Sequence, residues 1–247
     1  MPPEFDLGWA GAALSASMRL APVFAFAPPF TLLRMPARVR LLMVLVLAGC
    51  IAAGQPPVDP ASGAFVLRAA SDLLAGLGAA LALQLAFAAL GFVGRLIDVQ
   101  AGHGLAMLID PTTRAQSPLM GTLFGLAAGI AFFEMDAHHA LLRVLAAPAA
   151  ESPAVLMVAG GDLQPLLGYL GLVFSSAFGA GATVLVVLFV IDLSIAFVSR
   201  SLPQMNVLML GLQVKALALL VVAAASTLLI GPALVAVVRQ AIAFAGG

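Results

Sequence analysis

The chain has 247 residues, of which 63% are hydrophobic and only 9% are charged, and its formal net charge is zero because 11 basic residues balance 11 acidic ones. A soluble domain carries about 25% charged residues, so this composition excludes an ordinary soluble domain and predicts an integral membrane protein or a subunit buried in an apolar assembly. Nucleic-acid binding is not indicated either, because it needs a basic surface that this chain lacks.

The first apolar segment, residues 7–33, is interrupted by proline. Because proline removes a backbone donor and clashes with the preceding helical turn, Pro22 and the pair Pro28–Pro29 predict a kinked or broken helix. The next apolar run, residues 41–54, is too short to cross a hydrocarbon core of about 30 Å by itself. It must tilt, use its basic flank or stop short of spanning the membrane.

Four uncharged runs in the rest of the chain are about as long as a membrane span, which takes about 20 residues, or longer. Together with the two interrupted segments they predict an all-α protein with about six hydrophobic helices, some of them broken. Basic residues near the ends of these segments place both ends of the chain outside the cytoplasm. The four runs are residues 73–94, 115–133, 165–191 and 216–238.

Common catalytic signatures are absent, since the chain contains no HExxH, no GxSxG and no P-loop. The nearest approach to a metal site is FFEMDAHHAL, with Glu134, Asp136, His138 and His139. Adjacent histidines on a helix point roughly 100° apart, so both cannot easily bind one ion unless a loop lies between or beside them. We therefore interpret this segment as an interfacial turn between helices and expect no catalytic residue, no metal and no cofactor. A membrane metallohydrolase that uses Asp136, His138 and His139 is the rival interpretation.

Asp72 is an acidic residue near the start of a predicted span, and Arg68 lies one helical turn earlier. Two interpretations stay open. The two side chains could form a snorkelling pair at the membrane interface. Alternatively, Asp72 makes a buried polar contact with another helix, because ionisable groups inside a membrane are costly and usually face protein or water.

The stretch RLIDVQAGHGLAMLIDPTTRAQ, residues 95–116, is polar although it lies between two apolar runs. We expect the helix to continue past Asp98 and Gln100 and to break at Asp110–Pro111. A second polar insert covers residues 192–206, and its hydrogen-bonding groups must be hydrated or satisfied by neighbouring protein.

Five motifs, taken in order, resemble the FliR family, the export-gate component of the bacterial flagellar type III secretion apparatus, and its injectisome counterparts. They cover most of residues 30–215. The family usually has Glu where Asp72 stands, Gly where Ala137 stands and Pro where Gln213 stands. The motifs are MPARVRLLMVLVLA from residue 35, the pair Asp72 and Gly76, IDVQAGHGLAMLIDP from residue 97, DAHHALL from residue 136, and DLSIAFVSRSLPQMNVLMLGLQVK from residue 192.

The resemblance implies a single export-gate domain over residues 1–247, located in the bacterial inner membrane at the flagellar basal body. Its hydrophobic helices would pack as hairpins in a hetero-oligomeric closed pore with FliP-like and FliQ-like subunits, surrounded by membrane lipid. FlhB-like and FlhA-like export proteins would associate with this pore, and unfolded export substrates would pass through it. The matching family loop implies a pore plug formed by Asp110, Pro111, Thr112, Thr113, Arg114, Ser117 and Pro118.

The resemblance also implies that polar residues of the motifs contact the pore or neighbouring subunits. These residues are Asp72, Asp98, Gln100, Gly102, Asp192, Arg200, Pro203, Gln204, Asn206 and Lys215. The alternative function is a secondary transporter of a small solute, which would use Asp98, Asp192 or Arg19 as coupling groups. Such a transporter needs discontinuous helices in both halves of the chain.

Overall fold

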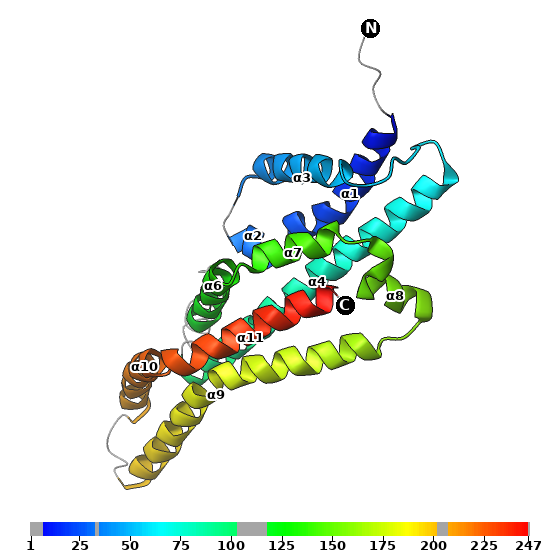
Figure 1. The fold of residues 1–247 in the computed structure, drawn as a ribbon. Helices are drawn as coiled ribbons and strands as arrows, with labels where there is room; N and C mark the ends of the chain where they lie inside the picture. Colours follow the sequence, from blue (N-terminus) through cyan, green and yellow to red (C-terminus); the bar gives the residue numbers. More distant parts are fainter. Residues whose placement is uncertain (1–6, 33–34, 103–117, 202–206, 247) are drawn as a thin grey trace. The chain divides into compact units, whose positions relative to one another are not determined.

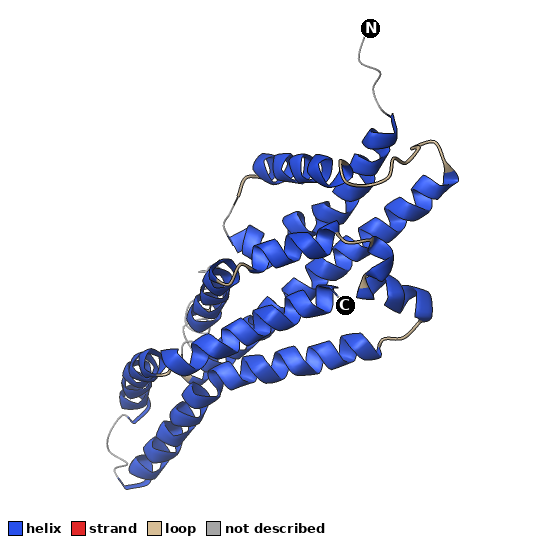
Figure 2. Cartoon of the chain, in the orientation of Figure 1, coloured by secondary structure: helices blue, strands red, loops and turns tan. Residues whose placement is uncertain are grey.

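The computed structural model describes residues 7–32, 35–102, 118–201 and 207–246 (Figure 1). Every regular element within these ranges is a helix, as Figure 2 shows, which confirms the predicted all-α class. The elements in chain order are α1 (Leu7–Phe26), α2 (Pro28–Leu32), α3 (Ala37–Ala52), α4 (Gly63–Gln100), α6 (Leu119–Glu134), α7 (Ala137–Ala146), η1 (Ala149–Glu151), α8 (Pro153–Gly160), α9 (Gln164–Ser201), α10 (Val207–Ala225) and α11 (Thr227–Gly246).

The helices form two compact units, each assembled from segments that are far apart in the sequence. Unit 1 contains α1 to α3, the first part of α4, α7, α8, the beginning of α9 and the end of α11. Unit 2 contains the rest of α4, most of α6 and α9, α10 and the first half of α11. Whether the whole chain is one domain stays a prediction.

The core of unit 1 includes a buried apolar stripe on α1, which packs against α3 (Figure 1). Ala12, Ala16, Leu20 and Val23 recur at intervals of three or four residues and are at most 3% exposed. This spacing places them on a single stripe of the helix. Arg40 of α3 donates a hydrogen bond to the carbonyl of Ala25 at 3.0 Å and so satisfies the last turn of α1.

Tyr169 holds the beginning of α9 and the end of α11 against α4 in unit 1. Its hydroxyl donates a hydrogen bond to the carbonyl of Ala82 at 2.6 Å. Its ring stacks on Phe244, with 4.3 Å between the ring centroids. A buried tyrosine needs such a partner for its hydroxyl, so this contact sets the register between the helices.

The core of unit 2 is formed where α4 meets α9. Val93 and Ile97 of α4 and Val184 and Leu188 of α9 are at most 1% exposed. A side chain added at Gly181 of α9 would collide with Val93, so the absence of a side chain lets the two helices approach closely.

Helix breaks differ from the predicted ones at two places. α1 continues through Pro22, whereas the predicted break at Pro28–Pro29 is confirmed, because Ala27 separates α1 from α2. The predicted continuous segment 216–238 is wrong, since α10 ends at Ala225 and α11 begins at Thr227. Thr227 Oγ1 donates to the carbonyl of Ala223 at 3.4 Å, and such back-bonding bends helices without changing hydropathy.

The described part of the chain contains several long apolar helices, as predicted. By length and composition α4, α9 and α11 can each cross a membrane, and α6 with α7, bent by 72° between them, forms either a broken span or a re-entrant loop. Two further apolar helices are shorter than a span, because α3 has only 16 residues and the apolar part of α10 is Gly211–Ala225. The predicted topology, with both chain ends outside, stays a prediction.

α1 and α4 are in close backbone contact beside Gly76. A Cβ atom placed on Gly76 would collide with the backbone carbonyl of Arg19. Because both partners are helix backbone, no side-chain rotation can relieve the collision. Gly76 therefore sets the distance between the two helices.

Gly76→Ala is expected to push α1 away from α4 and to lower the melting temperature of the purified chain in detergent, because overpacking costs about 1–3 kcal/mol. Gly168→Ala in α9 is the matched control, since a Cβ there meets nothing within 4 Å. Alanine favours a helix over glycine by about 1 kcal/mol, so the control should be unchanged or more stable. An equal loss in both variants would contradict the close packing at Gly76.

Candidate functional site on helix α4

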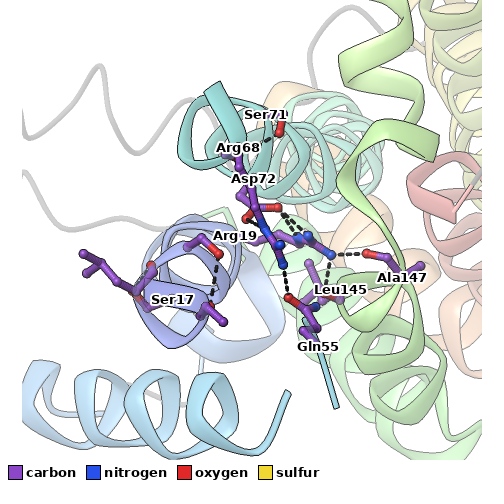
Figure 3. Close-up of polar contacts among 11 residues, drawn as sticks. Ser17, Arg19, Gln55, Arg68, Ser71, Asp72, Leu145 and Ala147 are labelled. Atoms are coloured by element: carbon purple, nitrogen blue, oxygen red, sulfur yellow. Dashed lines mark hydrogen bonds and ion pairs between the residues drawn. The ribbon is translucent and has the colours of Figure 1, made fainter. Parts of the chain in front are cut away.

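A buried ion pair joins α1 to α4 in unit 1 (Figure 3). Arg19 Nε donates to Asp72 Oδ1 at 3.1 Å, and Arg19 Nη2 contacts the same oxygen. The two side chains are only 5% and 1% exposed. Of the two interpretations of Asp72, the structure confirms the buried contact with another helix.

Arg19 also binds the end of α7. Its Nη1 donates to the carbonyl of Leu145 at 3.0 Å and to the carbonyl of Ala147. The last carbonyls of a helix have no partner within the helix and carry the negative end of its dipole. One guanidinium therefore satisfies the terminus of α7 and the carboxylate of α4 at the same time.

Arg68 and Gln55 complete this cluster at its more exposed side (Figure 3). Arg68 Nε lies 4.0 Å from Asp72 Oδ2, and Arg68 Nη2 donates to Gln55 Oε1. The Arg68 side chain is 28% exposed. An open cavity of about 640 Å³ adjoins the cluster and is lined in part by Gln55, Arg68 and Ser71. The cluster thus carries one more positive than negative charge, and the surplus lies at the cavity.

In unit 2, Asp98 of α4 binds the beginning of α6. Its two carboxylate oxygens accept the backbone N–H of Met120 at 3.1 and 3.0 Å, and the residue is 5% exposed. That N–H is one of the four donors that the first turn of a helix leaves unpaired, and a negative charge is favoured there. A Cβ on Gly94, one turn earlier on α4, would collide with the backbone of Gly121.

Lys215 of α10 links three helix segments of unit 2. Its ammonium pairs with the Asp192 carboxylate of α9 and donates to the carbonyl of Gln100, the last residue of α4, at 3.1 Å. The lysine side chain is 17% exposed and the aspartate 38% exposed. Since the contact includes a helix-terminal carbonyl, the positive charge is favoured in this position.

The end of α4 differs from the prediction. The helix continues past Asp98 but ends at Gln100, earlier than expected, and the predicted break at Asp110–Pro111 lies outside the described residues. The turn that follows includes Gly102, whose φ of 90° lies in the left-handed region that glycine adopts without strain.

The remaining predicted site residues are placed as follows. Pro118 precedes α6, and its carbonyl accepts a hydrogen bond from the backbone N–H of Thr122 at 2.9 Å. Arg200 is exposed in the last turn of α9. The other members of the predicted plug and of the second insert lie outside the described residues: Asp110, Pro111, Thr112, Thr113, Arg114, Ser117, Pro203, Gln204 and Asn206.

Arg19 connects helices, a role that was not predicted for it. Its signal was present, because an arginine inside an apolar segment must find acceptors within protein or water. Whether the histidine pair binds a metal ion stays a prediction, but the two histidines lie close to Asp136. One ligand atom from each of Asp136, His138 and His139 lies within 4.8 Å of the others.

The chain is an all-α protein, and three of its described helices are long and apolar enough to cross a membrane. Its buried polar residues Asp72 and Asp98 bind neighbouring helices. The family described as Bacterial export proteins, family 1, matches residues 10–241. The chain belongs to this family, and the resemblance to FliR is confirmed.

Relatives with curated descriptions match most of the chain. The flagellar biosynthetic protein FliR of Bacillus subtilis (strain 168) is 30% identical over 216 residues, which cover 83% of this chain and 81% of that protein. FliR of Escherichia coli (strain K12) is 23% identical over 212 residues, or 83% and 80% of the two chains. The surface presentation of antigens protein SpaR of Shigella flexneri is 27% identical over 203 residues, or 81% and 78%.

Asp72→Asn is expected to leave the buried Arg19 guanidinium without its counter-charge, at a cost of about 3–5 kcal/mol. The double variant Arg19→Leu/Asp72→Leu should cost less than the sum of its single changes, because the two losses share one interaction. Unfolding of the purified chain by SDS in mixed micelles measures these differences. Glu134→Gln, at an exposed carboxylate, is the control and should leave stability unchanged. Additive losses in the double variant would show that the pair is not coupled.

Proposed function

We propose that this chain is a core subunit of the inner-membrane export gate of a flagellar type III secretion apparatus. The family match over residues 10–241 carries the proposal, together with the FliR relatives that match most of the chain. In this role the chain forms a closed pore with FliP-like and FliQ-like subunits. FlhB-like and FlhA-like proteins associate with the pore, and unfolded flagellar substrates pass through it. The role needs no catalytic residue.

The apolar surface of the chain supports a role inside an assembly. Only 17% of the most apolar 18-residue stretch of α9 is buried within the chain. Large side chains on α9, α10 and α11 are exposed, including Phe189 at 60%, Phe197 at 65%, Val221 at 68% and Leu228 at 88%. So many large exposed apolar side chains favour contact with lipid or with other subunits. FliP-like and FliQ-like helices and membrane lipid would cover it.

The polar contacts of unit 2 support a plug at the segment between α4 and α6. Lys215 holds the last residue of α4, Gln100, just before this segment. Asp98 holds Met120, at the start of α6, just after it. A loop that closes a pore needs ends that do not move under load. These two contacts provide such ends, so residues 110–118 are proposed to act as the plug.

The transporter alternative has less support. Its candidate coupling groups all have structural partners within the described residues, because Arg19 pairs with Asp72, Asp98 caps α6, and Asp192 pairs with Lys215. A coupling group must change its partner during transport. The export-gate role requires no such exchange.

Co-expression with the FliP-like and FliQ-like subunits of the same genome tests the proposed function. A tagged copy of this chain is expected to recover both partners as one complex of defined mass after extraction in mild detergent. Recovery of this chain alone would contradict the proposal. Solute uptake by liposomes that contain only this chain would favour the transporter.

Deletion of residues 111–118 is expected to make the assembled gate leak ions and small solutes, because nothing would then close the pore. Leak is measured in cells that express the complete gate, and co-purification shows whether the deleted chain still assembles. Replacement of the same residues by an equal length of Gly and Ser separates loss of the plug from shortening of the chain. Normal assembly with no increase in leak would contradict the plug role.

A further inference from the structure

Three possible metal ligands meet at the turn where α7 begins. Asp136 immediately precedes the helix, and His138 and His139 are its second and third residues. Asp136 Oδ1 and His139 Nδ1 lie 3.3 Å apart. One ligand atom from each of the three side chains lies within 4.8 Å of the others.

The backbone at Asp136 accounts for this convergence. Its φ of 56° and ψ of 25° lie in the left-handed region. Asp136 is the only non-glycine residue with positive φ in the described part of the chain. Its carboxylate therefore reaches the first turn of α7 from outside the helix. The rings of His138 and His139 also lie together, with 4.1 Å between their centroids.

His138 provides an independent sign of a missing ligand. Its Nδ1 atom is buried and has no hydrogen-bond partner among the described residues. The Phe133 ring lies beside it, with 5.6 Å between the ring centroids, and offers no acceptor. Buried polar atoms are nearly always paired, and an unpaired one requires an explanation such as a bound ion or water.

The chemistry of the three groups suits a divalent transition metal. Imidazole nitrogen and carboxylate oxygen are ligands for Zn²⁺, and imidazole also suits Cu²⁺ and Ni²⁺. Ligand atoms on one tetrahedral Zn²⁺ lie about 3.3 Å apart, as follows from bonds of about 2.0–2.1 Å. Asp136 and His139 already meet this distance, and a ligand atom of His138 lies within 4.8 Å of theirs. With both histidines neutral, the cluster carries one negative charge, which favours a cation.

We propose that Asp136, His138 and His139 bind one divalent transition-metal ion, with Zn²⁺ chemistry, at the start of α7. Asp136 is 75% exposed and His139 is 61% exposed in their side chains, so an ion can enter from solvent. The ion would connect the turn before α7 to its first turn and so fix where the helix begins. The proposal replaces our expectation of no metal, which assumed that adjacent histidines diverge. It is independent of the export-gate function.

Equilibrium dialysis of the full chain against Zn²⁺ tests the site. The chain is purified in detergent with a tag that contains no histidine, and metal is removed before dialysis. About one ion per chain is expected, with a rise in melting temperature that a chelator reverses. His138→Ala and His139→Ala should each weaken binding at least tenfold. His103→Ala is the matched control, because His103 is the third histidine of the chain, and it should bind as the unaltered chain does.

Two further measurements keep the result clear if an alanine variant folds poorly. Asp136→Asn keeps the size of the side chain but removes the charge, and should weaken binding while circular dichroism stays unchanged. Co²⁺ in place of Zn²⁺ should give the visible absorption of a tetrahedral site, and this absorption should be lost in the two histidine variants. Weak binding that does not saturate and is equal in all variants would mean an adventitious ion only and would overturn the proposal. So would stoichiometric binding that His103→Ala alone removes.

Discussion

A guanidinium buried in an apolar helical unit must find its acceptors within the protein, and the arrangement of unit 1 depends on this requirement. Arg19 meets it with the Asp72 carboxylate and with the carbonyls at the end of α7. Both partners must therefore lie within hydrogen-bond distance of α1. Gly76, one turn after Asp72, makes that possible because its missing side chain admits the backbone of α1. Removing one partner of such a pair leaves an unpaired buried charge. This destabilises a protein far more than replacing both partners by apolar side chains does.

The same combination occurs a second time on α4. In unit 2, Gly94 and Asp98 are also one turn apart, and together they admit the beginning of α6 and cap it. In both cases a glycine allows close approach and a carboxylate satisfies donors on the approaching segment. Lys215 adds a third contact at the last residue of α4. α4 therefore takes part in the contacts on both sides of the predicted plug segment, at its own last residue and at the beginning of α6.

Hydropathy located the centres of α4, α6 and α9 but not their ends. α4 and α9 each have 38 residues, well beyond the uncharged runs 73–94 and 165–191 that predicted them. The helices continue through charged residues such as Asp72 and Asp98 because protein groups satisfy those charges. The opposite error occurred in the uncharged run 216–238, which was predicted as one helix but is broken at Ser226. Average hydropathy does not show that neighbouring protein satisfies a charge such as Asp72. It also does not show that the hydroxyl of Thr227 bonds to the backbone and bends the helix.

The composition and the order of the motifs were sufficient for the all-α class and the family. They could not identify Arg19 as the partner of Asp72, because 53 residues separate the two and a linear pattern contains no pairing information. Nor could they show that Asp136 reaches His139, because this contact depends on the left-handed backbone at Asp136. Such contacts arise only when helices pack, since packing decides which buried charge meets which acceptor.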